Sequence, residues 1–249
     1  MRLAWVSPLP PARSGIADYS AELVPALARE ADLTLFAPDP WDGALLPGWR
    51  IFPLEALPEN AADQDLIVYH MGNNPFHAEI YGLALRLPGV VVLHDYLLHH
   101  LVTRCTLQRG DLAGYVWHQA YERGSAGAAA ALRRALRVSS EREQFLDPLN
   151  RVLLDHSSGA IVHSRWVADQ VRRKCPSLPL CRVPHHRPPP VPAQREEFRR
   201  RLGVASDEVV VASFGFISPS KGVDSLLRAY AQLRQEFPQL RCFLVGQPE

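Results

Sequence analysis

The stretch MRLAWVSPLPPARSGIADYSAELVPALAREADLTLF (1–36) contains the unit from which the fold can be predicted. The apolar run 3–6 is typical of a short buried strand, and a proline-rich loop ends it. Apolar residues at helical spacing then predict a helix over 16–30, and a second apolar run, 33–36, predicts another strand. Strand, loop, helix and strand form a βαβ unit. We therefore expect parallel strands joined by a right-handed crossover.

The same alternation of strands and helices continues along the chain. Runs rich in β-branched residues predict strands at 66–69, 90–93, 159–163 and 180–183, and helical spacing predicts helices at 76–87, 165–174 and within 96–156. The runs are nearly continuous rather than alternating, which indicates strands covered on both faces. The fold class is therefore α/β, with a largely parallel sheet.

A proline-rich segment, 188–194, divides the chain into two predicted domains, 1–187 and 195–249. The second begins with a charged helix and then shows its own strand, helix and strand, at 209–214, 222–237 and 242–245. Three such elements cannot close a sheet and cover both its faces. We therefore expect a complete first domain and only the first βαβ part of a second one.

Composition narrows the class of protein. The 249 residues carry a net charge of +1 and are 47% apolar, which excludes a disordered tail and argues against bulk electrostatic binding of nucleic acid. The four cysteines lack the spacing of a disulfide framework or a zinc site. The sequence shows neither a signal peptide nor an apolar run long enough to span a bilayer. We expect a cytoplasmic protein. The basic runs 172–174 and 199–201 indicate either solvated helix faces or a peripheral contact with the inner face of the membrane.

In parallel α/β sheets, ligands bind beyond the carboxyl ends of the strands. After the first predicted strand, Gly15 would let a ligand approach the backbone, and the helix that follows offers free N–H groups. The alternative is an ordinary loop in which Ser14 caps the helix. Asp18 and Tyr19, in the same segment, are further candidate ligand-binding residues. The pattern GxGxxG is absent, so nothing here predicts a nicotinamide or flavin site.

Polar residues follow three later strands as well, and the candidate ligand-binding residues there are Asn73, His94, Asp95, His163 and Ser164. An imidazole at the position of His94 could bond a ligand hydroxyl, or it could be a buried histidine that holds the helical segment. Ser164 also suits the N-cap of the next helix. His94, Asp95 and His99 are close enough in sequence for a metal site. No further cluster supports one, so we predict no metal.

The strongest local feature is GFISPSKG (215–222), a strand-to-helix loop with Gly215 and Gly222 at its ends. Of the 27 basic residues only Lys174 and Lys221 are lysines, and Lys221 lies in this loop. A phosphate placed there would meet an ammonium and a helix N-terminus together. The alternative is an exposed loop lysine. A nucleophilic triad is not indicated, because G-x-S-x-G does not occur.

Four segments resemble the family 4 glycosyltransferases, which are retaining enzymes of the GT-B fold. They are PPARSGIADYSAEL (10–23), VVLHDYLLHHL (91–101), AIVHSRWVADQV (160–171) and, most specifically, ASFGFISPSKGVDSLLRAYAQLRQEFPQLRCFLVG (212–246). The resemblance implies two Rossmann-like domains with a cleft between them. The first would bind the acceptor (a glycan, a lipid-linked molecule or a small molecule), and the second would bind the nucleotide-diphosphate sugar.

The resemblance also implies roles for individual residues. His94 would contact the donor sugar and Lys221 would neutralise the diphosphate leaving group, so both are predicted catalytic residues. Gly215 and Gly222 would lie near the donor phosphates, and Gly15 would line the cleft near those phosphates or the acceptor. The acceptor-side candidates are Asp18, Tyr19, Asn73, Asp95, His163 and Ser164. Many members carry an arginine shortly before the lysine, where this chain has Phe216. No cofactor, metal or protein nucleophile is expected, which suits the family's front-face retaining mechanism.

The family's paired-glutamate motif would lie beyond position 249. By this resemblance the protein is a hexosyltransferase-type glycosyltransferase, and we expect the 249-residue chain alone to be inactive. The alternative hypothesis is a non-catalytic module, or inactive fragment, that binds a sugar or nucleotide.

Overall fold

The computed structural model describes residues 1–39, 41–42, 48–138, 143–187, 194–217 and 221–247. The chain divides into two compact units, Met1–His186 and Arg187–Glu249. Each is described by itself below. Within the described residues no helix is both long enough and apolar enough to cross a lipid bilayer.

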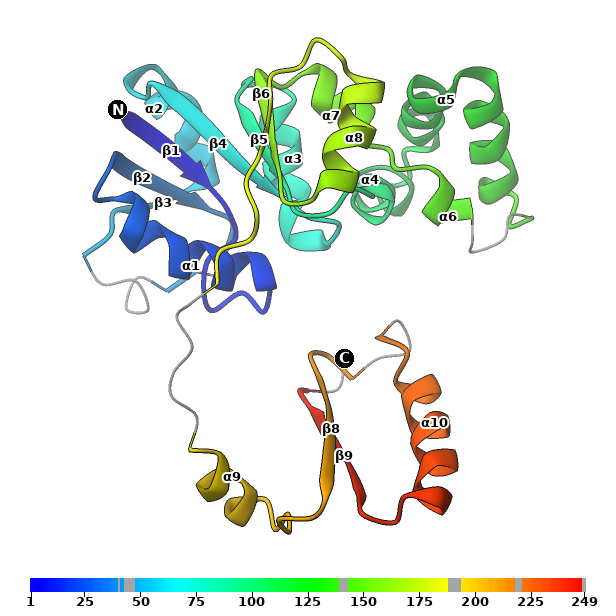
Figure 1. The fold of residues 1–249 in the computed structure, drawn as a ribbon. Coiled ribbons are helices and arrows are strands. Elements are labelled where there is room, and N and C mark those ends of the chain that lie inside the picture. The colour runs from blue at the N-terminus through cyan, green and yellow to red at the C-terminus, as the bar shows by residue number, and fades with distance from the viewer. Residues whose placement is uncertain (40, 43–47, 139–142, 188–193, 218–220, 248–249) are drawn as a thin grey trace. The chain divides into compact units, whose positions relative to one another are not determined.

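The first unit is built on a seven-stranded sheet in which every described pair of neighbours is parallel (Figure 1). The strands lie in the order β3 (Ile51–Pro53), β2 (Asp32–Ala37), β1 (Arg2–Val6), β4 (Leu66–Met71), β5 (Val90–Leu93), β6 (Gly159–Val162) and β7 (Leu180–Arg182). The strand order reverses between β1 and β4, which is the point where α/β sheets of this kind open a crevice. The predicted α/β class with a Rossmann-like sheet is confirmed.

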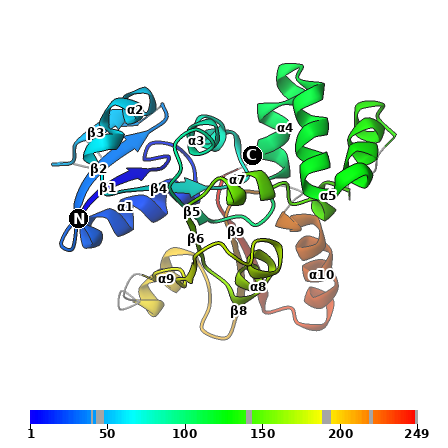
Figure 2. The same cartoon turned by 90° about the horizontal axis from the view of Figure 1, so that it is seen from above.

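Helices cover both faces of this sheet, and Figure 2 shows α1 and α3 on opposite sides of it. The helices are α1 (Gly15–Leu27), α2 (Leu57–Asn60), α3 (Ala78–Ala84), α4 (His99–Cys105), α5 (Leu112–Ala135), α6 (Glu143–Leu146), α7 (Arg151–Asp155) and α8 (Arg165–Lys174). Short 3-10 turns in the described part of this unit lie at Leu54–Ala56, Ala61–Asp63, Pro75–His77 and Leu107–Arg109. One core cluster lies between α1 and the sheet, and a larger one lies under α3, α4, α7 and α8.

Most predicted elements are present, with shifted ends. The helix predicted over 165–174 has those bounds as α8, whereas the helix predicted over 76–87 is a 3-10 turn followed by the shorter α3. The strand predicted over 66–69 continues to Met71, so His70 lies inside β4 and is fully buried. The short edge strand β3 was not predicted, because three residues carry too little pattern to be recognised.

The second unit consists of α9 (Arg195–Arg201), β8 (Val209–Phe214), α10 (Val223–Glu236) and β9 (Leu240–Val245). The two strands pair in parallel from Val209 with Leu240 to Phe214 with Val245, as the predicted βαβ unit requires. Its buried apolar residues among those described are Val204, Val223 and Leu240. Most of the predicted linker, 188–193, lies outside the described residues.

Candidate functional site

The carboxyl edge of the large sheet gathers histidines from four neighbouring strands. His70 lies in β4, while His94 follows β5 directly and His163 follows β6 directly. His185 lies in the segment after β7. The parallel register places Leu93 of β5 beside Val162 of β6, so the residues that follow these strands emerge side by side.

Tyr19 of α1 lies among these rings. Its ring centroid is 4.8 Å from that of His94, 5.6 Å from those of His163 and His185, and 4.7 Å from that of His186. Burial raises the pKa of the Tyr19 hydroxyl, so this side chain is a neutral phenol at pH 7. Tyr19, which the sequence placed on the acceptor side, therefore forms a half-buried wall of the histidine cluster.

Hydrogen bonds fix several of the rings. The Nδ1 atom of His70 lies 2.9 Å from Nε2 of His94, and one of the two must donate to the other. His77 donates from Nδ1 to the backbone carbonyl of His70 at 3.0 Å, and His163 donates from Nδ1 to the carbonyl of Val183 at 2.8 Å. A carbonyl can only accept, so Nε2 of His163 carries a lone pair when the ring is neutral.

The imidazoles of His70, His94 and His163 are neutral at pH 7. Burial, with a smaller effect of the neighbouring rings of His163, His185 and His77, lowers the pKa of His94 to about 3. Burial also holds the pKa of His70 well below its ordinary value and lowers that of His163. Neutral imidazoles exchange hydrogen bonds with hydroxyl groups or bind metals, whereas they offer no positive charge to a phosphate.

Asn73 and Asp95 lie side by side at the same edge. The backbone N–H of Asn73 donates to Oδ2 of Asp95 at 2.8 Å, and Oδ1 of Asn73 accepts from the N–H of Leu101 at 3.0 Å. Both residues line a cavity of about 700 Å³ in the first unit. The structure thus brings together two of the predicted acceptor-side residues, with Asn73 also holding the first turns of α4.

That cavity, called the edge pocket below, has an apolar wall and a polar one. Tyr96 and Trp166 contribute aromatic rings whose centroids are 5.1 Å apart, and Trp166 is 60% exposed. Leu97, Phe145, Leu146 and Pro148 extend the apolar wall, and the polar lining is Asn73, Asp95, Glu122, Arg123, Gln170 and Lys174. Aromatic faces beside carboxylate and amide groups suit a ligand that combines C–H faces with hydroxyls.

Lys174 lies at the polar side of the edge pocket and is mostly buried. Its ammonium donates to Glu122 and, at 2.7 Å, to Oδ1 of Asn150, and it lies 5.4 Å above the ring of Tyr96. The interpretation of 172–174 as a solvated or membrane-facing basic run is therefore wrong for Lys174, because a buried carboxylate holds its charge inside the protein. Arg172 and Arg173 are exposed.

The remaining candidates of the first unit lie at helix starts. Ser164 accepts from the N–H of Val167 at 3.1 Å and so caps α8. Ser14 caps α1, and Gly15 begins that helix with open space where a side chain would lie. Asp18 is exposed in the first turn of α1.

In the second unit, Lys221 is exposed and lies two residues before Val223, where α10 begins. Gly222 caps that helix with φ of +68°, and Gly215, at the end of β8, has φ of +121°. Both angles lie where side chains are disfavoured, which accounts for glycine at the two ends of the loop. Phe216 is 44% exposed beside Gly215, and 218–220 lie outside the described residues.

Sequence reasoning missed His70 and His185 as members of the cluster. His70 was expected after its strand, and His185, between the last predicted strand of the first domain and the proline-rich segment, was not singled out. The signal that could have found His185 is its position just after the last strand of the sheet. The structure does not form a metal site from His94, Asp95 and His99. The two ring nitrogens of His99 instead contact the carbonyl of Asp147 and the hydroxyl of Tyr115.

No protein-family model matches the chain. A stretch of 54 residues, 22% of this chain, is 48% identical to D-inositol 3-phosphate glycosyltransferase of Actinosynnema mirum and spans 13% of that protein's length. Among solved structures, apo UGT2 of Phytolacca americana is 13% identical, with a TM-score of 0.40, over 86% of this chain and 58% of that one. Over the matched stretch, this chain is therefore related to a glycosyltransferase.

Proposed function

We propose that this protein is a family 4, GT-B-type glycosyltransferase that moves a hexosyl group from a nucleotide-diphosphate sugar to an acceptor with retention of configuration. The observation that carries the proposal is the stretch of 54 residues that is 48% identical to a glycosyltransferase. The histidine cluster and the edge pocket, at the edge of a parallel sheet where ligands bind, supply the chemistry on the acceptor side.

The donor reaction needs positive charge near its leaving group. As the bond between the sugar carbon and the phosphate oxygen breaks, the electron pair stays on the diphosphate. The acceptor oxygen bonds to the sugar carbon on the same face and gives its proton to the departing phosphate oxygen. Lys221 and the N–H groups at the start of α10 would stabilise that charge without a metal. Gly215, Gly222 and Gly15 would border the phosphates.

His94 would act on the donor sugar through hydrogen bonds rather than through charge. Its depressed pKa keeps the ring neutral, so the ring can accept from or donate to a sugar hydroxyl but is a poor general acid at pH 7. His70 holds the orientation of that ring from the neighbouring strand.

The acceptor would bind in the edge pocket. An acceptor with hydroxyl groups can place an apolar face on Trp166 and Tyr96 and its hydroxyls on Asp95 and Asn73. Asp18, Tyr19, His163 and Ser164 would lie along its path as acceptor-side residues. We further propose a cytoplasmic location.

Transfer can be assayed in the full-length protein with a panel of nucleotide-diphosphate sugars, by following release of the nucleoside diphosphate together with the glycosylated product. We expect Lys221→Ala to lower turnover by roughly 10²–10³, the scale for loss of one charge-stabilising group. Arg228→Ala, which removes an exposed charge from α10, the helix that follows Lys221, is the matched control and should leave turnover unchanged. Equal rates for wild type and Lys221→Ala would remove Lys221 from the mechanism.

The same assay tests the first unit. His94→Ala should lower turnover, whereas His100→Ala, an exposed histidine on α4, should not. Saturable binding of a nucleotide sugar without any product, for every donor and acceptor offered, would contradict the transferase and indicate a binding module instead.

A further inference from the structure

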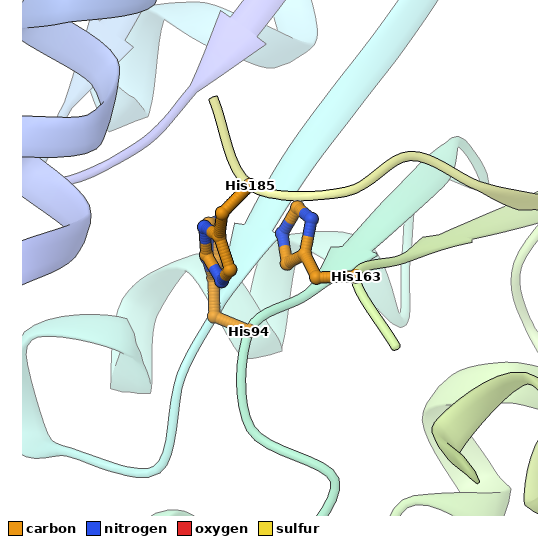
Figure 3. A group of neighbouring side chains, drawn as sticks. All are labelled: His94, His163 and His185. Atoms are coloured by element: carbon orange, nitrogen blue, oxygen red, sulfur yellow. The ribbon is translucent and has the colours of Figure 1, made fainter. Parts of the chain in front are cut away.

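Three imidazoles of the first unit converge at the carboxyl edge of the sheet. One ring nitrogen from each of His94, His163 and His185 lies within 4.8 Å of the others, and Figure 3 shows the three rings grouped together. The residues follow three adjacent strands, β5, β6 and β7, so the sheet brings together positions that are far apart in sequence. All three positions are set by strand ends rather than by one flexible loop.

The Nε2 atom of His163 is the clearest sign that this group binds something. It is buried and has no hydrogen-bond partner among the described residues, although Nδ1 of the same ring donates to the carbonyl of Val183. A buried lone pair without a donor is energetically unfavourable, so a ligand that engages it is favoured. A histidine whose other nitrogen is held by a backbone carbonyl is the usual arrangement of a metal ligand, because that bond fixes the tautomer and the ring orientation.

The other two rings can offer nitrogens to the same point. Nε2 of His94 is engaged by Nδ1 of His70, so Nδ1 of His94 is the atom available to a ligand. The ring centroid of His185 lies 3.9 Å from that of His163 and 5.9 Å from that of His94. His185 is exposed, so its ring can turn without disturbing the core.

We propose that His94, His163 and His185 together bind a divalent transition-metal ion such as Zn²⁺. With bonds of ~2.0–2.1 Å, tetrahedral zinc holds its nitrogens ~3.3 Å apart. The nitrogens, which lie within 4.8 Å of one another, must therefore approach by up to ~1.5 Å, and side-chain rotation provides this movement. Three protein ligands leave a position open for water or a ligand hydroxyl. The donor set contains no oxygen, so Mg²⁺ and Ca²⁺ should not bind.

This inference goes beyond the proposed function, which needs no metal. Both proposals use His94, but the readout here is metal binding rather than sugar transfer, so the failure of one can be told from the failure of the other. The protein, freed of any polyhistidine tag, is titrated with Zn²⁺ against a chromophoric chelator. Co²⁺ is then used as a probe, because tetrahedral nitrogen coordination gives it a strong visible absorption band.

We expect one Zn²⁺ per chain and a visible Co²⁺ band that Zn²⁺ abolishes. His185→Ala should weaken Zn²⁺ binding by ~100-fold, at least the loss seen when a supporting contact of a metal ligand is removed. Because His185 is exposed, this variant should fold normally, which circular dichroism checks. His100→Ala, also exposed, is the matched control and should bind Zn²⁺ like the wild type. Wild type that binds no Zn²⁺, or His185→Ala that binds it equally well, would overturn the proposal.

Discussion

Lys174 is one of two lysines in a chain that otherwise uses arginine, and its ammonium lies against the carboxylate of Glu122. Only 4% of the Glu122 side chain is exposed, and its other oxygen accepts from the N–H of Arg151. A compact ammonium fits between Glu122, Asn150 and the Tyr96 ring, where a planar guanidinium would need more room. The pair therefore holds α5, α7 and α8 together beside the edge pocket.

Loss of this lysine should destabilise the protein strongly. Lys174→Met leaves a buried carboxylate without a cation, which typically costs about 3–5 kcal/mol of unfolding free energy, and urea denaturation measures the loss. Arg172→Met, an exposed neighbour, should change the free energy by about 0.5 kcal/mol or less. The double variant Glu122→Gln/Lys174→Met should recover part of the loss. No recovery would show that the cost arises from packing rather than from the unpaired charge.

Helix α8 illustrates how an element carries both structure and candidate chemistry. Its first turn is capped by Ser164, and Ala168 and Val171 bury its inner face against the larger core cluster. Because Ser164 has a structural partner, a loss of activity on its removal does not by itself assign it to the acceptor site. A substitution that keeps the capping hydrogen bond separates the structural role of Ser164 from a role in acceptor binding.

Ser164→Ala should lower the free energy of unfolding by about 1 kcal/mol, because the N–H of Val167 loses its acceptor. Ser164→Asp supplies another capping oxygen and should keep nearly wild-type stability in the same urea denaturation. If the aspartate variant were as unstable as the alanine variant, the capping bond would not be the source of the effect.

The elements were largely predictable because their local patterns agree with their environment. The βαβ order of 1–36, helix α8 and strand β8 follow directly from apolar spacing, turn residues and a serine N-cap. The spacing of apolar residues in a strand does not show whether helices cover each face of the sheet completely. On the α1 side, Leu66, Val90 and Ile161 remain partly exposed around a hollow of about 380 Å³, although their apolar runs indicated burial on both faces.

The acid sensitivity of the whole molecule should come from histidines buried in a neutral state. Burial lowers the pKa of His99 and of His118 to about 4 each. Between pH 6.5 and 4 the unfolded chain therefore binds more protons at these positions than the folded one, so stability is complete above pH 6.5 and falls as the pH drops. His99 lies in α4 and His118 in α5, so this loss of stability at low pH arises in the helices of the first unit.

From pH 7 to pH 5 we expect the free energy of unfolding to fall by of order 1 kcal/mol for each such histidine. Urea denaturation at each pH measures the change. A control series at pH 7 and 8.5, where these imidazoles are neutral in both states, should show little change from this source. A stability that stays constant down to pH 5 would contradict the buried neutral state of these rings.

By itself, the sequence determined the α/β class, the parallel connections and the strand-end candidates His94, Asn73, Asp95 and His163, because these depend on local spacing and on a general property of parallel sheets. Only the tertiary structure decided that His185 joins His94 and His163, that His99 turns away from them, and that Lys174 is buried. Those outcomes depend on strand order and on which side chains meet across adjacent connections. The three histidines lie up to 91 positions apart in the sequence, and no local pattern encodes such a distance.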